Sequence, residues 1–497
     1  MDVIVVGAGS AGSVVARRLV DAGAAVTLLE AGGEDVNPAI HDPARAGELW
    51  HGPEDWDLYT VPQEHAANRR LHLPRGKVLG GSHALNAMIW VRGAPADYDG
   101  WGLPGWYWED VEPVFARLEK DLLDVVPNEP LHPVQRSIVD ACRETGLAFN
   151  PDYNGGTLDG VSVEQITLRG GRRFNTWHAY GAPVASRMTV HTGAMVHRLR
   201  FSGARVTGVE VSIDGVAREL SADLVVLAAG ALASPAILLR SGVGPAGELA
   251  ALGIDVVADL PGVGRNLHDH LLSPVIFSTS REVVPEPGRP VTQVHWFWRS
   301  RAGLAVPDTQ PICFSVPMYE PWMSGPPTGF SLMAGMVSPE SRGSLRLAPD
   351  GSPLIDLAAL SAPSDFESLV ASVEQCLAVG AAPALADGWG ARQLYPAPGD
   401  DAGEYVQRTA ITYHHQVGTC RMGTDAAAVV DPRLAVHGLD GLVVADASVL
   451  PRVTTGNTNA PAVLVGERAA RFILGADLPG RRAGGGARRT VWPGRRG

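Results

Sequence analysis

The chain has 497 residues, of which 45% are hydrophobic and 19% are charged. This length predicts two domains, or one large domain with a second inserted into it, and the composition excludes global disorder. The formal net charge of −12 argues against a nucleic-acid partner, because binding to phosphates requires a basic surface.

The N-terminal segment predicts one βαβ unit. The apolar run Asp2–Val6 is typical of a strand buried on both faces, and a second such run follows at Ala25–Leu29. Between them lie a glycine-rich turn and an amphipathic stretch through Val20, which is expected to be a helix. This order is typical of the beginning of a nucleotide-binding domain with a parallel sheet.

The turn carries the motif Gly7-Ala8-Gly9-Ser10-Ala11-Gly12. Its glycines allow a tight turn, a close approach of the backbone to a pyrophosphate and close helix–strand packing, and the helix N-terminus offers free N–H groups to the phosphates. Glu30 ends the second strand, at the spacing of a carboxylate that binds a ribose hydroxyl and disfavours NADP. The motif predicts a dinucleotide site without separating NAD from FAD; the alternative is a plain turn with a solvated Glu30.

Two further buried strands are expected much later in the chain, at 224–227 and 442–445. Buried strands at the beginning, middle and end of the chain indicate a discontinuous, Rossmann-like domain of the α/β class. We assign residues 1–150, 186–272 and 425–476 to this domain.

A second domain of the α+β class is expected from residues 151–185 and 273–424. Its segments mix β-forming residues with turn residues and predict an antiparallel sheet, and one stretch, 364–379, has helical spacing. The predicted strands are 275–279, 291–298, 312–316, 331–337 and 343–347. Residues 477–497 are rich in Gly and Arg and are predicted to form a disordered tail.

The cysteines Cys142, Cys313, Cys376 and Cys420 lie far apart and form no CxxC pair. This spacing predicts neither a zinc site nor a disulfide framework, and it fits a reducing compartment. The first strand starts at Asp2, which leaves no room for a signal peptide, and no apolar run reaches the roughly 18 residues needed to span a bilayer. We therefore expect a cytoplasmic protein with no membrane span.

Further segments resemble the glucose–methanol–choline (GMC) oxidoreductases. Residues 76–86, Gly-Lys-Val-Leu-Gly-Gly-Ser-His-Ala-Leu-Asn, are similar to the first family signature, and residues 230–244 fit the second at every defined position. The block 261–270 and the C-terminal run 413–474 also resemble the family, so the likeness thins only between about residues 273 and 400. The resemblance implies FAD rather than NAD.

The resemblance further implies that FAD is bound non-covalently. Some members attach FAD through a histidine directly before the signature asparagine, and this chain has Leu85 there. His83 stands where the family usually has a small hydroxyl residue or glycine, a departure that could alter the packing beside the flavin. The expected FAD-binding residues are Gly7, Gly9, Ser10, Ala11, Gly12, Glu30, Ala31, Lys77, Leu79, Gly80, Gly81, Ser82, Leu85, Asn86, Ala87, Met88, Val196, Ala229, Gly230, Asp446, Ala447, Asn457, Asn459 and Ala460.

Alcohol oxidation by a flavin requires a base for the hydroxyl proton and a polar group that holds its oxygen. The family's HxxGT pattern places the active-site histidine at His415, and an imidazole with an ordinary pKa of about 6.5 suits the role of base. Asn457 stands where the family has histidine or asparagine and is expected to hold the oxygen. The alternatives are a core histidine and a turn asparagine. On extended backbone His414 would point away from His415, and we expect it to line the pocket or support the structure.

The C-terminal segment is expected to serve the flavin. Pro461 predicts the start of a helix over 462–474, and in the family the positive end of this helix faces the flavin pyrimidine ring. Asp446 resembles the family's acid near the flavin ribityl and phosphate groups, with a capping residue as the alternative. Asn459 is expected to support the flavin edge. The histidines of the block 266–270 are spaced by two on a loop, so we predict no metal site.

The substrate pocket is poorly defined by the sequence. Trp296 and Trp298 would share one face of a strand. That face either lines a pocket over the flavin, together with Phe314 and His414, or belongs to the core, and for the tryptophans we favour the core. An apolar pocket would favour an aromatic or aliphatic primary alcohol over a sugar.

Together these features predict an FAD-dependent alcohol oxidase or dehydrogenase that forms an aldehyde by hydride transfer to flavin N5. Its partners would be a small-molecule alcohol and either O2 or another electron acceptor. The alternatives are a GMC-fold enzyme without net oxidation, such as a hydroxynitrile lyase or a light-driven decarboxylase, and a non-catalytic flavoprotein.

Overall fold

In the computed structural model, which describes residues 1–475, strand β1 (Asp2–Val6) is the middle strand of a five-stranded parallel sheet. Its apolar residues are buried on both faces, as a central parallel strand requires. The sheet order is β24 (Leu442–Val444), β13 (Leu224–Leu227), β1, β2 (Ala25–Leu29) and β9 (Thr189–His191). The chain therefore returns to this sheet from its first, middle and last thirds, as the buried runs predicted.

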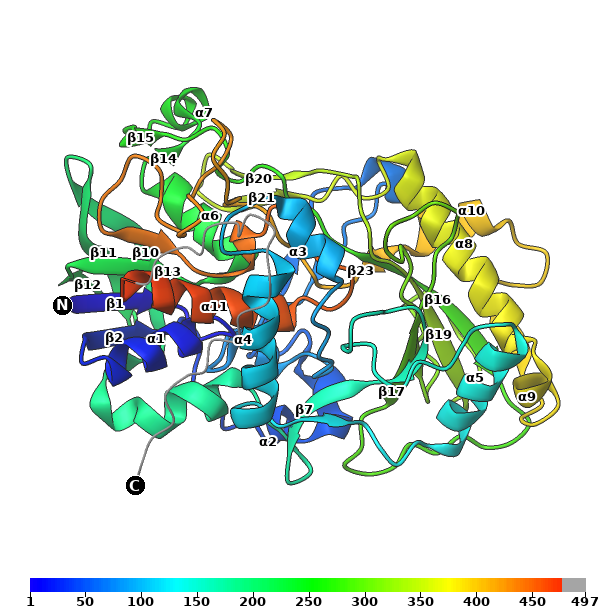
Figure 1. Cartoon of the computed structure of the whole chain (residues 1–497). Helices are drawn as coiled ribbons and strands as arrows, with labels where there is room; N and C mark the ends of the chain where they lie inside the picture. The colour runs from blue at the N-terminus through cyan, green and yellow to red at the C-terminus, as the bar shows by residue number, and fades with distance from the viewer. Residues whose placement is uncertain (476–497) are drawn as a thin grey trace, which may run out of the picture.

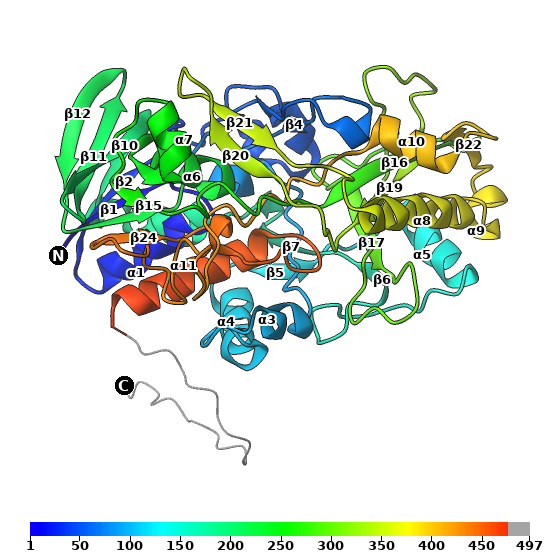
Figure 2. The same ribbon diagram turned by 90° about the horizontal axis from the view of Figure 1, so that it is seen from above.

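Two helices pack against each other beside this sheet, α1 (Gly12–Asp21) and α11 (Asn459–Ile473) (Figure 1). Their close approach depends on Gly466, because a Cβ there would lie 2.7 Å from the carbonyl oxygen of Ala11. An antiparallel sheet of β10 (Ala194–Ser202), β11 (Arg205–Ile213) and β12 (Val216–Ser221) lies at the same end of the molecule (Figure 2).

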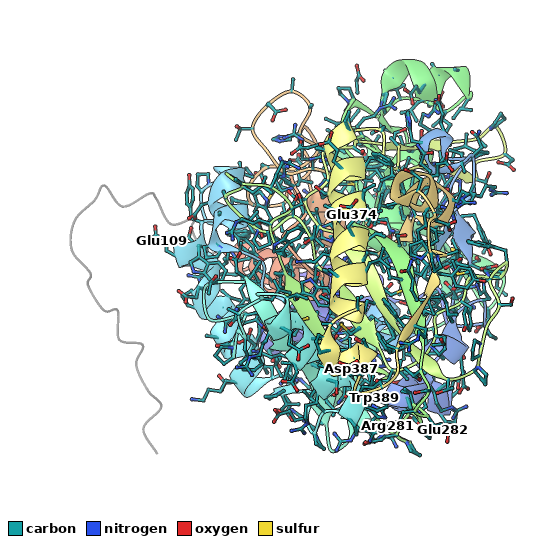
Figure 3. The ribbon with its side chains drawn as sticks, turned by 90° about the vertical axis from the view of Figure 1, so that its right-hand side faces the viewer. Glu109, Arg281, Glu282, Glu374, Asp387 and Trp389 are labelled. Atoms are coloured by element: carbon teal, nitrogen blue, oxygen red, sulfur yellow. The ribbon has the colours of Figure 1, made fainter. Side chains whose placement is uncertain are left out.

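A seven-stranded antiparallel sheet is at the other end of the described chain, with α8 (Pro363–Gly380) and α5 (Pro133–Glu144) packed on it. Figure 3 looks onto this outer face, where α8 crosses the sheet with Glu374 on its outward side. The sheet order is β22 (Arg392–Tyr395), β16 (Leu271–Ser278), β19 (Gly329–Met336), β18 (Ile312–Phe314), β17 (Thr292–Phe297) and β6 (Gly160–Val163), with β23 (Ile411–Thr412) beside β16.

Shorter elements connect these units. They are α2 (Pro38–His41), β3 (Leu58–Tyr59), β4 (His72–Leu73), α3 (Pro95–Trp101), α4 (Trp108–Asp121), β5 (Val125–Pro127), β7 (Gln165–Arg169), β8 (Arg172–Arg173), α6 (Gly230–Arg240), β14 (Val243–Gly244), α7 (Ala246–Ala251), β15 (Ala258–Asp259), β20 (Ser344–Leu347), β21 (Pro353–Asp356), α9 (Pro383–Ala386) and α10 (Ala402–Thr409). No helix within residues 1–475 is both long enough and apolar enough to cross a membrane.

The predicted α/β class with an antiparallel second unit is confirmed. One predicted strand is placed differently, since β20 pairs with β21 in a small separate sheet that contacts α6. The position of α5 also differs from the predicted domain division. Its residues were assigned to the first domain, but the helix packs on β17 and β6 of the second sheet. The side chain of Gln135 on α5 donates to the Cys313 carbonyl of β18, which ties this helix to the second sheet. The predicted tail, 477–497, lies outside the described residues.

Candidate active site and cofactor cavity

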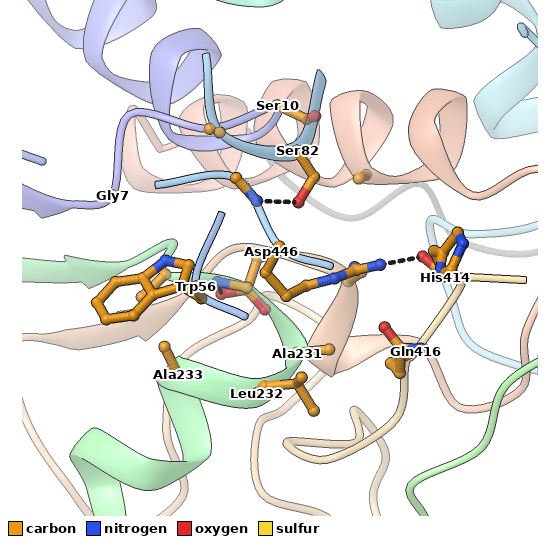
Figure 4. A pocket seen from close by; sticks show the side chains of 18 of the residues that line it. Gly7, Ser10, Trp56, Ser82, Ala231, Leu232, Ala233, His414, Gln416 and Asp446 are labelled. Atoms are coloured by element: carbon orange, nitrogen blue, oxygen red, sulfur yellow. Dashed lines mark hydrogen bonds between the residues drawn. The ribbon is translucent and has the colours of Figure 1, made fainter. Parts of the chain in front are cut away.

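A cavity of about 480 Å³ lies between the two large sheets, within the range typical of small-molecule sites. Its walls combine the turn after β1, the end of β2, the start of α6, the end of β18 and the loop after β23. Figure 4 shows the turn after β1 at Gly7, the start of α6 at Ala231 and the loop after β23 at His414. Residues from distant parts of the sequence therefore face one space, and most of the predicted site residues are among them.

The glycine-rich turn forms one end of this cavity. Gly7 has a φ of +100°, and a Cβ on Gly12 would lie 1.9 Å from the Gly7 carbonyl oxygen, so both positions require glycine. Gly81 approaches the same turn, because its Cβ would lie 2.7 Å from the Gly9 Cα. The turn and the segment that resembles the first GMC signature are thus in direct contact, with backbone exposed toward the cavity.

Glu30 is buried beside the turn rather than solvated. Its carboxylate accepts hydrogen bonds from the backbone N–H groups of Ala8 and Gly32, both at 2.9 Å. Burial raises the pKa of Glu30 to about 7, although these hydrogen bonds oppose the rise. The side chain lines the cavity where the sequence places a ribose hydroxyl.

Most of the residues assigned to FAD line this cavity. They are Gly7, Gly9, Ser10, Ala11, Glu30, Ala31, Gly81, Ser82, Leu85, Asn86, Ala87, Val196, Ala229, Gly230, Asp446, Ala447, Asn457 and Asn459. Gly12, Lys77, Leu79, Gly80, Met88 and Ala460 are not among its lining residues. Lys77, for example, lies 5.1 Å from the ring centre of Trp56, and it is the tryptophan that faces the cavity.

His415 and Asn457 meet at the other end. The Nδ2 atom of Asn457 lies 3.2 Å from Nε2 of His415, and its Oδ1 accepts a hydrogen bond of 2.9 Å from Gln310. Because the amide oxygen is engaged by Gln310, the amide N–H group faces the imidazole. A hydroxyl at this end of the cavity can therefore contact an imidazole nitrogen and an amide donor together.

His415 is held from behind by two residues that the sequence analysis did not assign to the site. Its Nδ1 lies 3.0 Å from Nδ1 of His270, and its backbone N–H donates to Asp269 at 2.8 Å. Burial lowers the pKa of His415 well below its usual value and that of His270 to about 3, so both rings are neutral near pH 7. Both residues stand in the 261–270 block, whose resemblance to the family was the available signal.

We expected His414 to point away from His415 because we assumed an extended backbone, and that assumption is wrong. His414 has a φ of +67°, so the backbone is not extended there, and both histidines line the cavity. The carbonyl oxygen of His414 accepts a hydrogen bond from Arg75, and its ring meets Trp50 edge-on at 5.1 Å. His414 therefore contributes to the cavity wall.

Trp296 and Trp298 belong to the core, which was the favoured of the two interpretations. Trp296 is fully buried and donates its indole N–H to Gln375 on α8, and Trp298 packs against the same core. His295, on the opposite face of β17, lies 3.2 Å from Gln310. Phe314, by contrast, lines the cavity as expected.

His83 is buried behind the cavity wall. Its Nε2 lies 2.9 Å from the Thr167 hydroxyl and 3.2 Å from Nδ2 of Asn459, and burial lowers its pKa to about 3. Asn459 in turn accepts a hydrogen bond from the Ser10 hydroxyl at 2.7 Å. The unusual histidine thus supports Asn459 and, through it, the dinucleotide turn.

Asp446 lies on the cavity wall and also caps a short helical turn, the alternative role considered for it. Its carboxylate accepts hydrogen bonds from the Gly230 N–H at 2.9 Å, from the Ser234 hydroxyl and, at the cap, from the Ser448 N–H. His268, considered as a metal ligand, has both ring nitrogens engaged, by the Asn266 carbonyl and the Val453 N–H.

Comparisons with known proteins agree with this arrangement. Family models for GMC oxidoreductase match residues 1–272 and 339–466. An uncharacterized GMC-type oxidoreductase of Mycobacterium tuberculosis is 37% identical over 95% of this chain and 99% of its own length. An alcohol dehydrogenase [acceptor] of Pseudomonas putida is 34% identical over 95% of both chains.

Among solved structures, pyridoxine 4-oxidase from Mesorbium loti superposes with a TM-score of 0.89 at 33% identity, covering 96% of this chain and 99% of its own. The cavity combines a glycine-rich turn at a helix N-terminus with the buried acid Glu30, which suits a dinucleotide such as FAD, and its far end carries the His415–Asn457 pair. The chain belongs to the GMC oxidoreductases and is an FAD-dependent enzyme that acts on CH–OH donors.

Proposed function

We propose that this enzyme oxidises a primary alcohol with an aromatic or aliphatic body to the aldehyde. The observation that carries the proposal is the 3.2 Å contact between Nε2 of His415 and Nδ2 of Asn457, both on the cavity wall. In this position His415 takes the proton of the substrate hydroxyl at Nε2, and Asn457 donates a hydrogen bond to the same oxygen.

FAD would lie along the cavity, from the glycine turn to the His415 end, with Glu30 near the ribose. The bound flavin would supply a hydride acceptor for the carbinol carbon, with O2 or another acceptor as the final oxidant. The N-terminus of α11 supports this placement, because Thr458 and Asn459 at its start line the cavity. Its positive end stabilises negative charge that develops beside it.

We propose that FAD is held non-covalently. Leu85, at the position of the family's attachment histidine, is a lining residue without a nucleophilic atom. The His83 ring is occupied by Thr167 and Asn459 and is not among the cavity-lining residues. Acid precipitation should therefore release the flavin into the supernatant, whereas yellow precipitated protein would contradict this assignment.

The lining of the cavity supports a neutral, apolar substrate. Leu272, Ile312 and Phe314 line it near the second sheet. Among the described lining residues, the carboxylates are Glu30 and Asp446, and both accept hydrogen bonds from backbone N–H groups. A cationic alcohol such as choline would find no free carboxylate partner here.

The test is a comparison of kcat/KM for benzyl alcohol, 1-butanol, choline and glucose, followed as aldehyde formation. The proposal predicts that one of the neutral apolar alcohols is the best substrate of this set. Preference for choline or glucose would contradict it.

We also propose a cytoplasmic location, which the four buried, unpaired cysteines support.

A further inference from the structure

A cluster of two histidines and two aspartates lies at the rim of the cavity, where the loop before β3 meets β4. It consists of His51, Asp55 and Asp57 from the loop and His72 from β4. The rings of His51 and His72 stack with centroids 3.9 Å apart, and one nitrogen of each ring lies beside Oδ1 of Asp57. The flavin site uses none of these four side chains.

Three ligand atoms, on His51, Asp57 and His72, lie within 4.8 Å of one another, and Asp55 lies beside His72. His51 Nδ1 and His72 Nε2 lie 2.7 and 3.1 Å from the same oxygen, Oδ1 of Asp57, and His72 Nε2 lies 3.2 Å from Oδ2 of Asp55. In a tetrahedral site with metal–ligand distances of about 2.0–2.2 Å, neighbouring ligand atoms are separated by about 3.3 Å. The observed separations are shorter than this, so an ion requires the atoms to move apart and the stacked rings to tilt until both nitrogens point at it.

The charges of the cluster also suit a divalent cation. Asp55 is fully buried and accepts backbone N–H bonds from His51, Asp57 and Arg75, which favour its ionised form. Within residues 1–475, the ion pairs of the two aspartates are with histidines alone. His72 Nε2 is buried and makes no well-aligned hydrogen bond, although two carboxylates lie beside it. A metal ion would give this nitrogen a ligand role and balance both carboxylates.

We propose that His51, Asp55, Asp57 and His72 bind a divalent transition-metal ion, with Zn²⁺ as the best match to two imidazoles and two carboxylates. From the sequence we predicted no metal site, so this proposal departs from that prediction. The site is independent of the proposed alcohol oxidation, because it contains none of the residues assigned to it.

Such an ion would stabilise part of the cavity wall. Trp50 and Trp56, which flank His51 and Asp57 in the sequence, both line the cavity, as does Leu58 at the start of β3. The ion would join this loop to β4 and hold both tryptophans in place. We therefore infer a structural ion that shapes the wall near His414 and that takes no part in the redox step.

A second group, Asp35, His41 and His178, provides an internal comparison. Its His178 Nε2 lies 2.7 Å from Asp35, but His41 Nε2 is already hydrogen-bonded to the Asp35 carbonyl oxygen at 2.8 Å. This group therefore has fewer nitrogen atoms free to bind a metal than the cluster at His51 and His72. It serves as the competing location in the test.

The experiment uses the FAD-loaded enzyme, stripped of metals by chelator and dialysis. Zn²⁺ binding is measured by isothermal titration calorimetry and by metal analysis after gel filtration, for the wild type, Asp57→Asn, Asp35→Asn and the surface control His197→Ala. One ion should bind the wild type and both controls. Asp57→Asn should bind more than about 100-fold more weakly, because loss of even an outer-shell partner costs about 10- to 100-fold.

Thermal unfolding supplies a second readout. Zn²⁺ should raise the Tm of the wild type and of Asp35→Asn, and leave that of Asp57→Asn unchanged, since only a ligand bound to the native state stabilises it. Failure of the wild type to bind Zn²⁺ would overturn the proposal. Binding that survives in Asp57→Asn, or is lost in Asp35→Asn instead, would overturn it as well.

Discussion

The Nδ1 atoms of His270 and His415 lie 3.0 Å apart, on the side of His415 away from Asn457. Two neutral imidazoles share such a contact only if one donates and the other accepts. Gln310 orients the Asn457 amide so that its N–H group faces Nε2 of His415, which must then accept. The proton of His415 therefore resides on Nδ1 and is donated to His270, which leaves Nε2 free to act as the base.

Replacement of His270 should test this tautomer. His270→Leu removes the acceptor, and we expect kcat to fall by about 10²-fold, a loss at the lower end of a general-base contribution. His270→Asn, whose carbonyl oxygen can accept the Nδ1 proton, should recover part of the activity. The readouts are the single-turnover rate of flavin reduction and its pH profile at equal FAD content. Equal losses in both variants would point to a packing role instead.

Asn457 should be sensitive to its amide donor. In Asn457→Asp, a carboxylate oxygen replaces Nδ2 and repels the developing alkoxide, so we expect flavin reduction to slow by about 10²- to 10³-fold. Asn457→His supplies a ring N–H instead and is the matched control, because the family uses histidine here. Rapid-mixing absorbance measurements would compare both with the wild type. An Asn457→Asp enzyme with normal rates would remove this residue from the mechanism.

Gly81 should be required for FAD binding. A Cβ there would lie 2.7 Å from the Gly9 Cα, and its φ of +54° is unfavourable for alanine. Gly81→Ala should therefore be purified with little FAD, whereas Gly33→Ala, whose Cβ meets no atom within 4 Å, should remain yellow. The ratio of flavin to protein absorbance measures this. Normal loading of Gly81→Ala would contradict the contact.

Glu164 should make stability depend on pH. Burial raises its pKa from 4.5 to about 8, against a hydrogen bond of 2.6 Å from Thr292. Because the folded protein holds this proton more tightly, the stabilisation is present below pH 4.5 and is lost as the pH rises through about 8.

Glu164→Gln should remove this dependence. Relative to the wild type, the variant should gain stability steadily between pH 5 and pH 9, as measured by urea unfolding. The buried histidines change the free energy of unfolding with pH in the opposite direction. They are present in both proteins, so their contribution cancels in the difference between them. A constant difference in the free energy of unfolding across this range would show that Glu164 is already ionised.

Local patterns in the sequence predicted the first domain well. The bounds of β1 and β2 follow from short apolar runs, and the turn between β1 and α1 from its glycines, because these features depend on neighbouring residues. The resemblance placed His415 and Asn457, which the structure brings to one cavity wall.

The remainder depended on tertiary contacts. His270 and His415 are separated by 145 positions, and no local pattern indicates that their rings meet. The left-handed φ of His414 overturned an argument from extended backbone. Trp296 and Phe314 are both aromatic strand residues, and only the packing of α8 decides that the first is core and the second lines the cavity.

The central claim is that His415 enables hydride transfer from an alcohol to the flavin. The most direct measurement mixes the FAD-loaded wild type and His415→Ala with benzyl alcohol or 1-butanol under anaerobic conditions and follows the oxidised-flavin absorbance. The account predicts bleaching of the wild type and a rate at least about 10²-fold lower in His415→Ala at equal FAD content. Bleaching of both proteins at the same rate, or of neither with any alcohol, would contradict it.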